Sequence, residues 1–567
     1  METTATIAAY EALAREIERL GVEATFGLMS DDTAMLVATL DSMGVRFHGS
    51  RHESTGVSMA EGYATATGRL GIAILGRGPA TANAANGALF ALRSGARVLL
   101  IFGAPSTSVG AAPNALGPDT KALDQARLLE AIGLKTFVAT DAQALRRTFA
   151  LAVAATEHGA AALLLPMNVQ FARIAAEEPA APRPAAPKTP PKARGAAISA
   201  ALALLQNSRR PLIVAGLGAH RAGAREAIEQ LADRLGAALA TTLKTKDMFR
   251  GHRCNLGVIG SFSHAAGRRL MDQADCVIVF GAGFNQRSTS YGTALPPDVP
   301  VIQVDRDRSH IGRWFSADVA LVADARVAAQ QLCEALPERA EADKPFHAEA
   351  TRRALADFDI ASEFQPASTP RTIDPRLLAL ELDKLLPADR NVVYDIGNFF
   401  QVVPYLSVQG PQHIKITTDS SSIGHGFGTA LGFACGRPGQ TTVLVIGDGG
   451  LLMTLGELET VVREDIPLVI VLMNDCAYGA ELHYLKNRNM PVATALFLDI
   501  DFAPIAAAFG FETATVRTLD ELRRLAPILR RPQGPIFIDC KINGAIEAPF
   551  VAESAEHEKR MAAAQAA

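Results

Sequence analysis

The chain has 567 residues, and at about 150 residues per domain this length predicts three to four domains. Hydrophobic residues make up 49% and charged residues 20% of the sequence, which is typical of a folded globular protein and excludes an intrinsically disordered one. The chain has 55 Lys and Arg and 59 Asp and Glu, so its net charge is −4. A protein that binds nucleic acid or anionic membranes would have a surplus of basic residues, so the charge argues against both classes.

The first part of the chain predicts a helix and not a targeting segment. Residues 1–27 include acidic side chains and have the pattern of an amphipathic helix, which is unlike a signal peptide. No apolar run approaches the about 18–20 residues that a membrane-spanning helix requires. The six cysteines never form a CxxC pair, which indicates a reducing compartment and no structural zinc. We therefore expect a cytoplasmic protein without a membrane partner.

Two stretches divide the chain. Residues 177–194 are rich in Pro and Ala, which predicts an extended linker. Residues 337–370 are polar and charged without a strong strand pattern, which predicts a second linker. We therefore expect domains at 1–176, 195–336 and 371–552, followed by a surface helix or frayed tail at 553–567.

Each predicted domain contains short apolar runs followed by helical patterns. The runs lie at 71–76 and 96–105 in the first domain, at 209–218, 274–284 and 299–305 in the second, and at 391–397, 441–449, 466–475 and 534–540 in the third. Continuous β-branched runs without alternation are typical of strands that are covered on both faces, as in parallel sheets flanked by helices. The sequence therefore predicts an α/β fold with three doubly wound parallel-sheet domains.

Two of the runs in the third domain end in polar clusters. One ends in Gly-Asp-Gly-Gly at 447–450, and the next ends in Asn-Asp at 474–475. Because the carboxyl ends of neighbouring parallel strands meet at one edge of a sheet, the side chains of Asp448 and Asp475 can reach the same cation. Carboxylate oxygens suit Mg²⁺, and the glycines leave backbone N–H groups open to a diphosphate. The alternative is an ordinary nucleotide-binding turn.

This Gly-Asp-Gly turn, followed one βαβ unit later by Asn-Asp, resembles the thiamine diphosphate (ThDP) motif of the pyruvate oxidase, pyruvate decarboxylase and acetolactate synthase superfamily. Three further segments are similar to that superfamily. Residues 51–92, with Arg-His-Glu and AEGYA, resemble its pyrimidine-binding segment, 209–333 its central domain, and 417–434 the stretch before the Gly-Asp-Gly turn. The pattern looks most like acetolactate synthase and benzaldehyde lyase. It implies ThDP and Mg²⁺ as cofactors.

The resemblance implies roles for three residues around the reacting end of the cofactor. Glu53 matches the catalytic glutamate, whose carboxyl group hydrogen-bonds the aminopyrimidine ring and promotes proton removal from the thiazolium carbon C2. Ile423 falls where the superfamily places an apolar residue that bends the cofactor, and the carbonyl of Ser421 would accept the 4′-amino hydrogen. The alternatives are a solvated helix-start acid for Glu53 and an ordinary core residue for Ile423.

The same match implies the metal ligands and the remaining cofactor contacts. Mg²⁺ would be held by the Asp448 and Asp475 side chains and the carbonyl of Ala477. The superfamily usually has Asn where this chain has Asp475, so this site carries an extra negative charge. The cofactor-binding positions implied in addition to Glu53 are Gly397, Asn398, Ser421, Ile423, Gly447, Asp448, Gly449, Gly450, Asp475, Ala477, Tyr478 and Gly479.

The substrate side of the site departs from the superfamily. The loop at 26–32 has Met29 and Ser30 in place of the Pro-Gly of relatives. Asp31 then falls where decarboxylases of this group carry a catalytic Asp or Ser, and Glu481 lies near a decarboxylase acid. The alternatives are a helix N-cap for Asp31 and a surface residue for Glu481.

Several histidines and one loop bear on the reaction. The His-His pair that marks pyruvate decarboxylases is missing from 105–125, and Thr120 and Lys121 stand near the Gln of acetolactate synthases and benzaldehyde lyase. The candidate site histidines, each with a structural alternative, are His52, His264, His425 and His483.

These observations predict an enzyme that makes or breaks a C–C bond beside a carbonyl. The favoured hypothesis is acetolactate-synthase-like carboligation after decarboxylation of a 2-oxo acid. The alternatives are a simple 2-oxo-acid decarboxylase, an aldehyde lyase or ligase, an acyl-CoA decarboxylase, and a cofactor-binding pseudoenzyme or regulatory subunit. A nicotinamide dehydrogenase would require a complete GxGxxG motif, of which 216–223 has only part.

The resemblance also implies partners. We expect 2-oxo acid or aldehyde substrates, no nucleic acid, and a homodimer or homotetramer whose sites lie between subunits, with Glu53 on one chain and Asp448 on the other. The segments at 281–290 and 302–313 resemble FAD-binding segments of acetolactate synthase, with Arg287 as a phosphate contact. In other relatives the central domain binds no cofactor.

Overall fold

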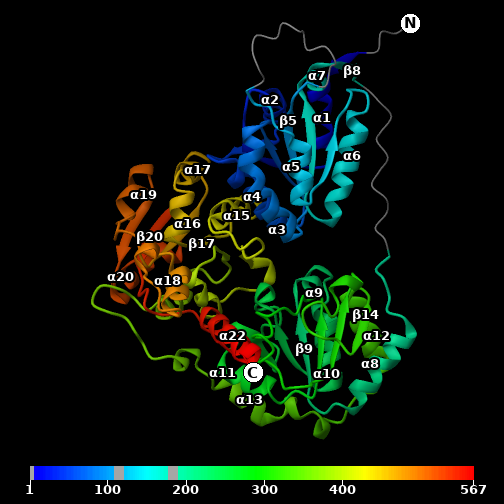
Figure 1. Ribbon diagram of the computed structural model, residues 1–567, viewed down its shortest axis with the longest axis vertical. Helices are drawn as coiled ribbons and strands as arrows, with labels where there is room; N and C mark the ends of the chain where they lie inside the picture. The colour runs from blue at the N-terminus through cyan, green and yellow to red at the C-terminus, as the bar shows by residue number, and fades with distance from the viewer. Residues whose placement is uncertain (1–4, 107–119, 177–188, 567) are drawn as a thin grey trace.

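Three six-stranded parallel sheets, each flanked by helices, form the molecule (Figure 1). The computed structural model describes residues 5–106, 120–176 and 189–566. The N-terminal domain lies at the top of Figure 1, with the central domain at the lower right and the C-terminal domain at the lower left. The prediction of three doubly wound α/β domains is confirmed, whereas most of the first predicted linker, 177–188, lies outside the described residues.

The N-terminal domain has the strand order β3-β2-β4-β5-β7-β6, with every neighbouring pair parallel. Its strands are β2 (Ala24–Leu28), β3 (Arg46–Gly49), β4 (Gly71–Leu75), β5 (Val98–Ala104), β6 (Lys135–Val138) and β7 (Ala161–Pro166). Its helices are α1 (Ala9–Arg19), α2 (Ala34–Ser42), α3 (Glu53–Thr67), α4 (Pro79–Ser94), α5 (Gln125–Ile132), α6 (Leu145–Ala155) and α7 (Met167–Phe171). Strands β1 (Thr6–Ala8) and β8 (Arg173–Ala175) pair antiparallel beside the sheet.

The central domain has the order β11-β10-β9-β12-β13-β14, in which the chain runs outward from the centre in both directions, as in dinucleotide-binding folds. Its strands are β9 (Pro211–Ala215), β10 (Ala238–Thr241), β11 (Asn255–Val258), β12 (Cys276–Phe280), β13 (Val301–Asp305) and β14 (Val319–Val322). Its helices are α8 (Gly195–Asn207), α9 (Leu217–Arg221), α10 (Arg225–Leu235), α11 (Ala265–Met271) and α12 (Ala325–Ala335).

The C-terminal domain has the order β16-β15-β17-β18-β20-β19, which repeats the topology of the N-terminal domain. Its strands are β15 (Asn391–Tyr394), β16 (Ile414–Ile416), β17 (Thr442–Gly447), β18 (Leu468–Asn474), β19 (Glu512–Val516) and β20 (Ile536–Lys541). Its helices are α14 (Pro375–Leu385), α15 (His425–Gly436), α16 (Asp448–Met453), α17 (Glu457–Arg463), α18 (Gly479–Lys486), α19 (Ala503–Phe509), α20 (Leu519–Arg524), α21 (Ala526–Arg530) and α22 (Pro549–Ala566).

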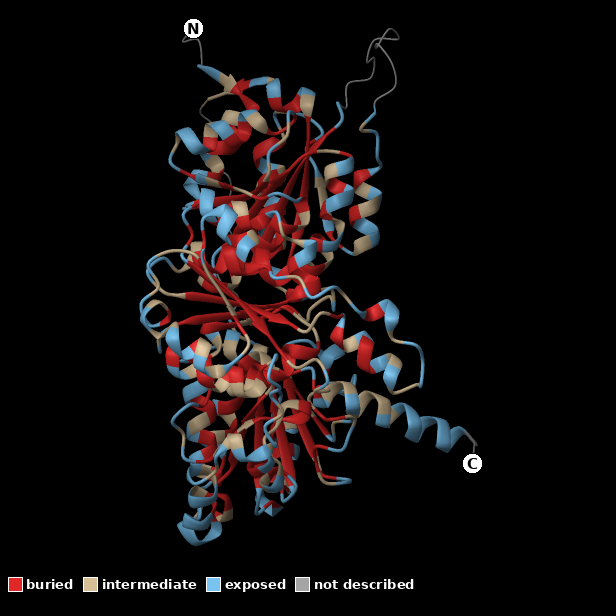
Figure 2. Cartoon of the chain, turned by 90° about the vertical axis from the view of Figure 1, so that its left-hand side faces the viewer, coloured by how far each residue is buried: buried red, intermediate tan, exposed pale blue. Residues whose placement is uncertain are grey.

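The strands are the most buried part of each domain (Figure 2). In β4, Ile72 and Ile74 pack into one apolar cluster while Ala73 and Leu75 pack into another, because successive side chains of a strand point to opposite faces. The second cluster continues through α3 and α15 to strand β17 of the C-terminal domain. One apolar core therefore joins the N-terminal and C-terminal sheets.

The second predicted linker is partly structured. Within 337–370, helix α13 (Glu349–Ala356) forms, and Phe346 lies in an apolar cluster of the central domain. Helix α22 includes the predicted tail and projects from the body with mostly exposed side chains (Figure 2). None of the helices in the described residues is both long and apolar enough to cross a bilayer.

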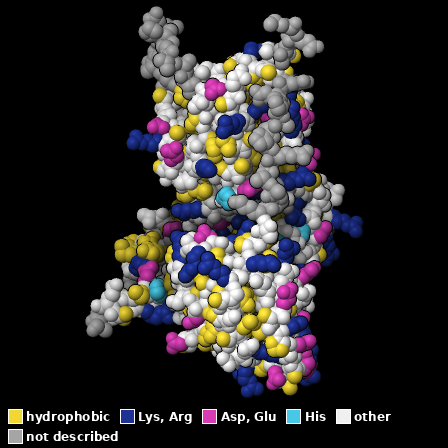
Figure 3. Space-filling model, turned by 90° about the vertical axis from the view of Figure 1, so that its right-hand side faces the viewer, with side chains coloured by type: hydrophobic (Ala, Val, Ile, Leu, Met, Phe, Trp, Pro, Cys, Tyr) yellow, Lys and Arg dark blue, Asp and Glu magenta, His cyan; other side chains and the backbone are white. Residues whose placement is uncertain are grey.

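The domains also meet through polar contacts. Viewed from the side of α6 and α12, Lys and Arg side chains lie along the boundary between the N-terminal domain and the rest of the molecule (Figure 3). One of the contacts between the N-terminal and central domains is a hydrogen bond that Arg221 Nη2 donates to the carbonyl of Ser94, at 2.8 Å.

Candidate active site

The carboxyl ends of three neighbouring strands of the C-terminal sheet carry acidic residues, of which Asp395 and Asp448 are buried and Asp475 is half-buried. Asp395 follows β15, Asp448 follows β17 and Asp475 follows β18, at the edge where the strand order of a doubly wound sheet opens a crevice. Strands β15 and β17 are parallel neighbours, and between them the order in which strands are added to the sheet changes direction. This edge is therefore the place where such a fold binds ligands.

Asp448 and Asp475 form a pair of carboxylates without a cation partner. Burial raises the pKa of both carboxyl groups, and repulsion from Asp448 raises that of Asp475 further. Neither side chain forms an ion pair with a Lys, Arg or His in the described part of the chain. Two adjacent buried carboxylates are unfavourable unless a positive charge lies between them.

Glycines allow close packing around this pair. The N–H of Gly449 donates to Asp448 at 3.0 Å. A Cβ on Gly449 would press against the ring of Tyr478, and one on Gly479 would overlap the Asp475 carboxylate. The segments that follow β17 and β18 can therefore approach each other this closely only because these positions are glycine.

The residues present fit a divalent cation that carries a diphosphate. No group of three or more His, Cys, Asp or Glu side chains in a metal-binding arrangement exists within the described ranges. Protein ligation would therefore come from the two carboxylates and the carbonyl of Ala477. Mg²⁺ commonly takes one or two carboxylates and completes its shell with phosphate oxygens and water.

A short loop carries Ser421 and Ile423 and contacts helix α16. The loop connects β16 to α15, and Gly424 at its end packs beside Met453 and Thr454, which follow the Gly-Asp-Gly turn. Ile423 is half-buried, whereas Ser421 is exposed and has a positive φ of 56°. The loop thus lies beside the helix that begins at Asp448, and contact of Ile423 with the cofactor stays a prediction.

Helix α3, which begins at Glu53, packs against helix α15. Among the described residues, α3 and α15 form the most extensive contact between two elements. Gly62 and Gly432 allow this contact, because a Cβ on either would overlap the backbone of the facing helix. Glu53, at the start of α3, is 8% exposed and accepts a hydrogen bond from Asn83 Nδ2 at 3.1 Å. Asn86 Nδ2 donates to Ser422 Oγ at 3.0 Å, so the N-terminal domain touches the loop of Ile423.

Three family models match the chain. They are "Thiamine pyrophosphate enzyme, N-terminal TPP binding domain" over residues 7–126, "Thiamine pyrophosphate enzyme, central domain" over 198–332, and "Thiamine pyrophosphate enzyme, C-terminal TPP binding domain" over 395–540. Each match falls on one of the three sheets. The chain belongs to the thiamine pyrophosphate enzyme family. The predicted superfamily and the cofactor ThDP are thereby confirmed.

Relatives in this family carry out different reactions. The chain is 26% identical to a probable acetolactate synthase large subunit of Methanocaldococcus jannaschii, with 95% of this chain and 93% of the relative covered. It is 28% identical to a probable 2-ketoarginine decarboxylase of Pseudomonas aeruginosa, with 92% of each covered. It is also 28% identical to a sulfoacetaldehyde acetyltransferase of Alcaligenes xylosoxydans xylosoxydans, with 90% and 88% covered. Likeness to the acetolactate synthases is confirmed, whereas the reaction is not fixed by these names.

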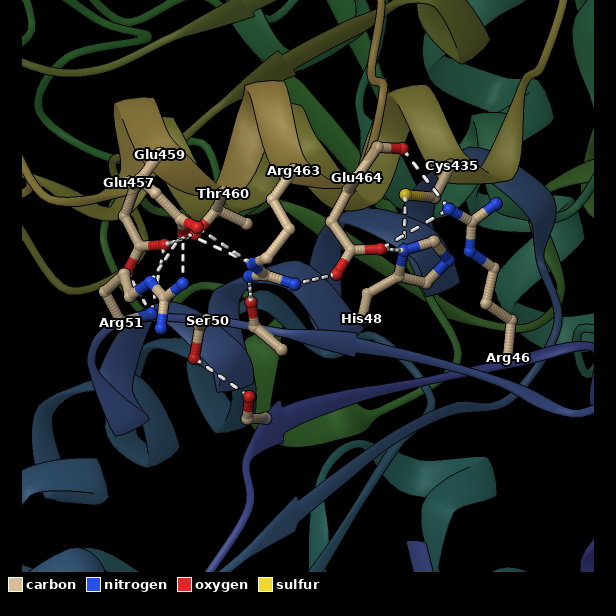
Figure 4. A network of polar contacts seen from close by, with 12 residues as sticks. Arg46, His48, Ser50, Arg51, Cys435, Glu457, Glu459, Thr460, Arg463 and Glu464 are labelled. Atoms are coloured by element: carbon tan, nitrogen blue, oxygen red, sulfur yellow. Dashed lines mark hydrogen bonds and ion pairs between the residues drawn. The ribbon is translucent and has the colours of Figure 1, made fainter. Parts of the chain in front are cut away.

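A polar network holds the turn that precedes Glu53 (Figure 4). The carboxylate of Glu457, on helix α17, accepts hydrogen bonds from the backbone N–H of Arg51 at 3.0 and 3.2 Å. His48 Nδ1 pairs with Glu464 at 3.0 Å, and the side chain of Arg51 pairs with Glu459. The C-terminal domain therefore fixes the start of α3, and with it the position of Glu53.

The sequence did not single out three residues that organise this family site. Asp395 accepts hydrogen bonds from the N–H groups of Gly424 and Gly426, and it lies beside Gly450. Asn83 and Glu457 hold Glu53 and its turn. Asp395, like Asp448, directly follows a buried strand, so its position in the sequence could have indicated a site residue. Nothing in the sequence around Asn83 and Glu457 indicates their roles.

Other predicted contacts have structural partners. The side chain of Asn398 donates to the carbonyl of Ile546 at 2.8 Å and accepts from the N–H of Ala548 at 2.9 Å, although Gly479 packs against it. Gly397, just before it, has a φ of 156°. His52 and His264 accept hydrogen bonds as N-caps of α3 and α11, and His483 bonds the carbonyl of Gly544. The structural alternatives are the better description of these three histidines.

The substrate side contains two ion pairs. Lys121 pairs with Asp31, and hydrogen bonding to Lys121 lowers the pKa of that carboxyl. Behind it, buried Asp32 lies 3.7 Å from Arg77. Glu481 is exposed on the first turn of α18. Most of the loop in which pyruvate decarboxylases carry a His-His pair, residues 107–119, lies outside the described ranges.

Arg287 is the residue of the central domain that was predicted to contact a phosphate of FAD. Its guanidinium donates to the carbonyl of Phe550 at 2.6 Å and lies over the rings of Tyr291 and Phe550. The turn after β9 is packed directly against the turn after β12, since a Cβ on Gly216 would overlap Ala282. Arg287 therefore binds the C-terminal segment and does not fit the predicted role of phosphate contact.

His425, the first residue of α15, is buried and neutral and contacts helices α3 and α4. Its ring stacks on Phe90 at 4.5 Å, and Nδ1 lies 2.9 Å from Ser58 Oγ, whose hydroxyl donates to the carbonyl of Ser54. The tautomer that fits carries its proton on Nδ1, and Nε2 has no partner in the described residues. Burial lowers the pKa of His425 to about 4.

The protein should therefore lose stability as the pH falls from about 6.5 to about 4, because over this range the unfolded chain binds a proton at this histidine that the folded chain does not. We expect the variant His425→Gln to be less stable than the native protein at pH 7.5 and to lose this deficit at pH 4.5. Thermal unfolding midpoints of both proteins across this range measure the effect. A deficit that stays constant with pH would contradict the buried neutral state.

Proposed function

We propose that this protein is a ThDP- and Mg²⁺-dependent enzyme that decarboxylates a 2-oxo acid and joins the remaining acyl unit to a second carbonyl compound, as acetolactate synthases do. Acetolactate synthases are among its relatives over almost the whole chain. The paired carboxylates and glycines at the strand ends support Mg²⁺ and the diphosphate. The contact between α3 and α15 supports a site built from both cofactor-binding domains.

The observation that carries the choice of carboligation is the ion pair between Lys121 and Asp31. A decarboxylase that releases an aldehyde needs an acid to protonate the acyl carbon. Lys121 pairs with the Asp31 carboxylate and lowers its pKa, which favours the ionised form over the proton-donating form. Glu481 is exposed to solvent. Attack on a second carbonyl needs no protonation of the acyl carbon, which favours ligation over aldehyde release.

The residues of this chain would act by positioning and by holding a proton. Bound ThDP supplies the carbon that attacks a carbonyl and accepts the electron pair of the broken C–C bond. Glu53 would exchange a proton with the pyrimidine ring, held by Asn83. Asp448, Asp475 and the Ala477 carbonyl would hold Mg²⁺, and Ile423 would pack against the cofactor.

Product analysis tests the proposed reaction. The purified protein is supplied with ThDP, Mg²⁺ and a panel of 2-oxo acids, with and without aldehyde acceptors, and products are identified by NMR. We expect acyloin or acetolactate-type products. Aldehyde as the sole product would replace the proposal with a simple decarboxylase, such as the 2-ketoarginine decarboxylase relative. Bound ThDP without turnover of any donor would indicate an acyl-CoA or acyloin substrate, or a pseudoenzyme.

We also propose that the protein works as a homodimer or homotetramer. Large apolar side chains are exposed around the candidate site, on α16 and near α18, and a second copy would cover them: Leu452, Met453, Tyr478, Leu496 and Leu498. In the described chain, α3 and α15 of one polypeptide pack against each other. We propose that the assembled enzyme keeps this contact and that each site pairs Glu53 of one chain with Asp448 of the other.

Mixing two inactive chains tests this arrangement. Chains with Glu53→Gln and with Asp448→Ala are co-expressed with different tags, and the mixed dimer is isolated. If each site takes Glu53 from one chain and Asp448 from the other, one of the two sites is intact, and about half of the native activity returns. If each site lies within one chain, both sites carry a defect and no activity returns. Cytoplasmic location and FAD binding stay predictions.

A further inference from the structure

The loop that carries Ser421 and Ile423 is held in a disfavoured backbone conformation. Ser421 has a φ of 56°, a left-handed value that residues with a side chain rarely adopt. Such a conformation persists only when the surrounding structure fixes it. The contacts on both sides of this loop, residues 420–424, therefore decide its shape.

One anchor lies within the C-terminal domain. Asp395 is fully buried, and its carboxylate accepts hydrogen bonds from the N–H of Gly424 at 2.8 Å and from Thr417 Oγ1 at 3.2 Å. This anchor fixes the downstream end of the loop at the start of α15. It is independent of the other two domains.

The other anchor comes from outside the domain. Asp419, directly before the loop, pairs with Lys415 at 3.1 Å and with Lys244 of the central domain. Lys415 also pairs with Glu61 of helix α3 at 2.6 Å. These four residues, here called the three-domain junction, join one side chain from the N-terminal domain, two from the C-terminal domain and one from the central domain.

The junction is buried, and a further cation faces it. The side chain of Glu61 is fully buried, those of Asp419 and Lys415 are 5% and 10% exposed, and that of Lys244 is 35% exposed. Arg221 of the central domain also interacts electrostatically with Asp419 and Glu61. Removing one partner of a buried ion pair is strongly unfavourable, because the remaining charge stays in a poorly solvated place. Without Lys244, Asp419 loses its direct ion pair with the central domain at the start of the loop.

We propose that Lys244 is a positioning residue, through which docking of the central domain onto Asp419 sets the shape of the 420–424 loop. The inference rests on the proposed function, which assigns this loop to the cofactor. The central domain would then contribute to ThDP binding without holding the cofactor itself. The loop would take its cofactor-binding shape only when all three domains are assembled.

Backbone amide exchange of the full-length, cofactor-free protein tests the junction directly. We expect Lys244→Met to speed exchange in peptides covering 420–424 by about tenfold, because a charge-assisted hydrogen bond is lost. Lys244→Arg should restore the native rate, since it keeps the charge and the reach. Lys384→Met is the control, because it removes the same charge and breaks an ion pair with Glu381 on α14, away from the loop but in the C-terminal domain that carries it.

Calorimetric titration with ThDP and Mg²⁺ provides the second readout. The dissociation constant of Lys244→Met should rise about tenfold, with Lys244→Arg and Lys384→Met near native values. Native exchange and native affinity in a folded Lys244→Met protein would overturn the proposal. If Lys244→Met does not fold, Asp419→Asn takes its place with the same expectations. Failure of the native protein to bind ThDP would overturn the proposed function, whereas the exchange result would still decide the role of Lys244 in the loop.

Discussion

Replacing Glu53 by Gln should lower the exchange rate of the C2 proton of bound ThDP by about two to four orders of magnitude, the usual range for loss of a proton-transfer group. The amide of Gln keeps the shape of the side chain and can still contact Asn83, but it cannot accept a proton from the ring. The affinity for ThDP should stay within a few-fold of the native value, because diphosphate and metal contacts lie on the C-terminal domain. The loss would then fall on the chemical step and not on binding.

The control for this variant is Glu130→Gln, an exposed carboxylate on α5 of the same domain. It should leave both the exchange rate and the affinity unchanged. The exchange is followed by NMR after dilution of the holoenzyme into deuterium oxide and acid quench. An undiminished rate in Glu53→Gln would remove Glu53 from the catalytic role.

Replacing Asp448 by Ala should weaken binding of ThDP in the presence of Mg²⁺ by at least about 100-fold, or about 2.7 kcal/mol. Mg²⁺ would lose the most buried of its protein ligands, and a single carboxylate at Asp475 would remain. Asp475→Asn should weaken binding by less than about tenfold, because the amide oxygen can still coordinate a hard cation. Calorimetric titration of metal-free protein with ThDP and Mg²⁺ measures both constants.

The replacement Asp475→Asn, which weakens cation binding, should stabilise the cation-free protein. Without a cation, Asp475 suffers burial and repulsion from Asp448, so its neutral replacement relieves both. Asp475→Asn should therefore raise the unfolding temperature of the cation-free protein while it weakens cation binding. A variant that loses stability in the absence of cations would show that the two carboxylates do not form a repulsive pair.

The sequence predicts most interior strands of this fold and none of its edge strands, and it misses the interior strands β2, β7 and β10. β4, β5, β17 and β18 lie inside their sheets and are continuous apolar runs, because both faces are covered by helices. β6 and β19 carry no such run: β6 lies at the edge of its sheet and has no buried side chain, and β19 at its edge has one. A short, half-exposed strand has no pattern that distinguishes it from a loop.

The residues of the candidate site also fall into two groups, those that the sequence predicts and those that it does not. Asp448 and Asp475 follow buried strands, and the topology of parallel sheets places such residues together. Lys244 and Asp419 are far apart in the chain, and so are Glu457 and Arg51, so their pairing depends on how whole domains dock. The partner of Asp31, Lys121, lies 90 residues away in the chain. Long-range contacts of this kind have no local signal in the sequence.

The most direct test of the account is a calorimetric titration of the native, metal-free protein with ThDP, in the presence and absence of Mg²⁺. The account predicts saturable binding of one ThDP per chain that depends on Mg²⁺, since the carboxylates at Asp448 and Asp475 repel a diphosphate until a cation lies between them. Absence of binding with Mg²⁺ present, or equal binding without it, would contradict the assignment of this strand edge as the cofactor site.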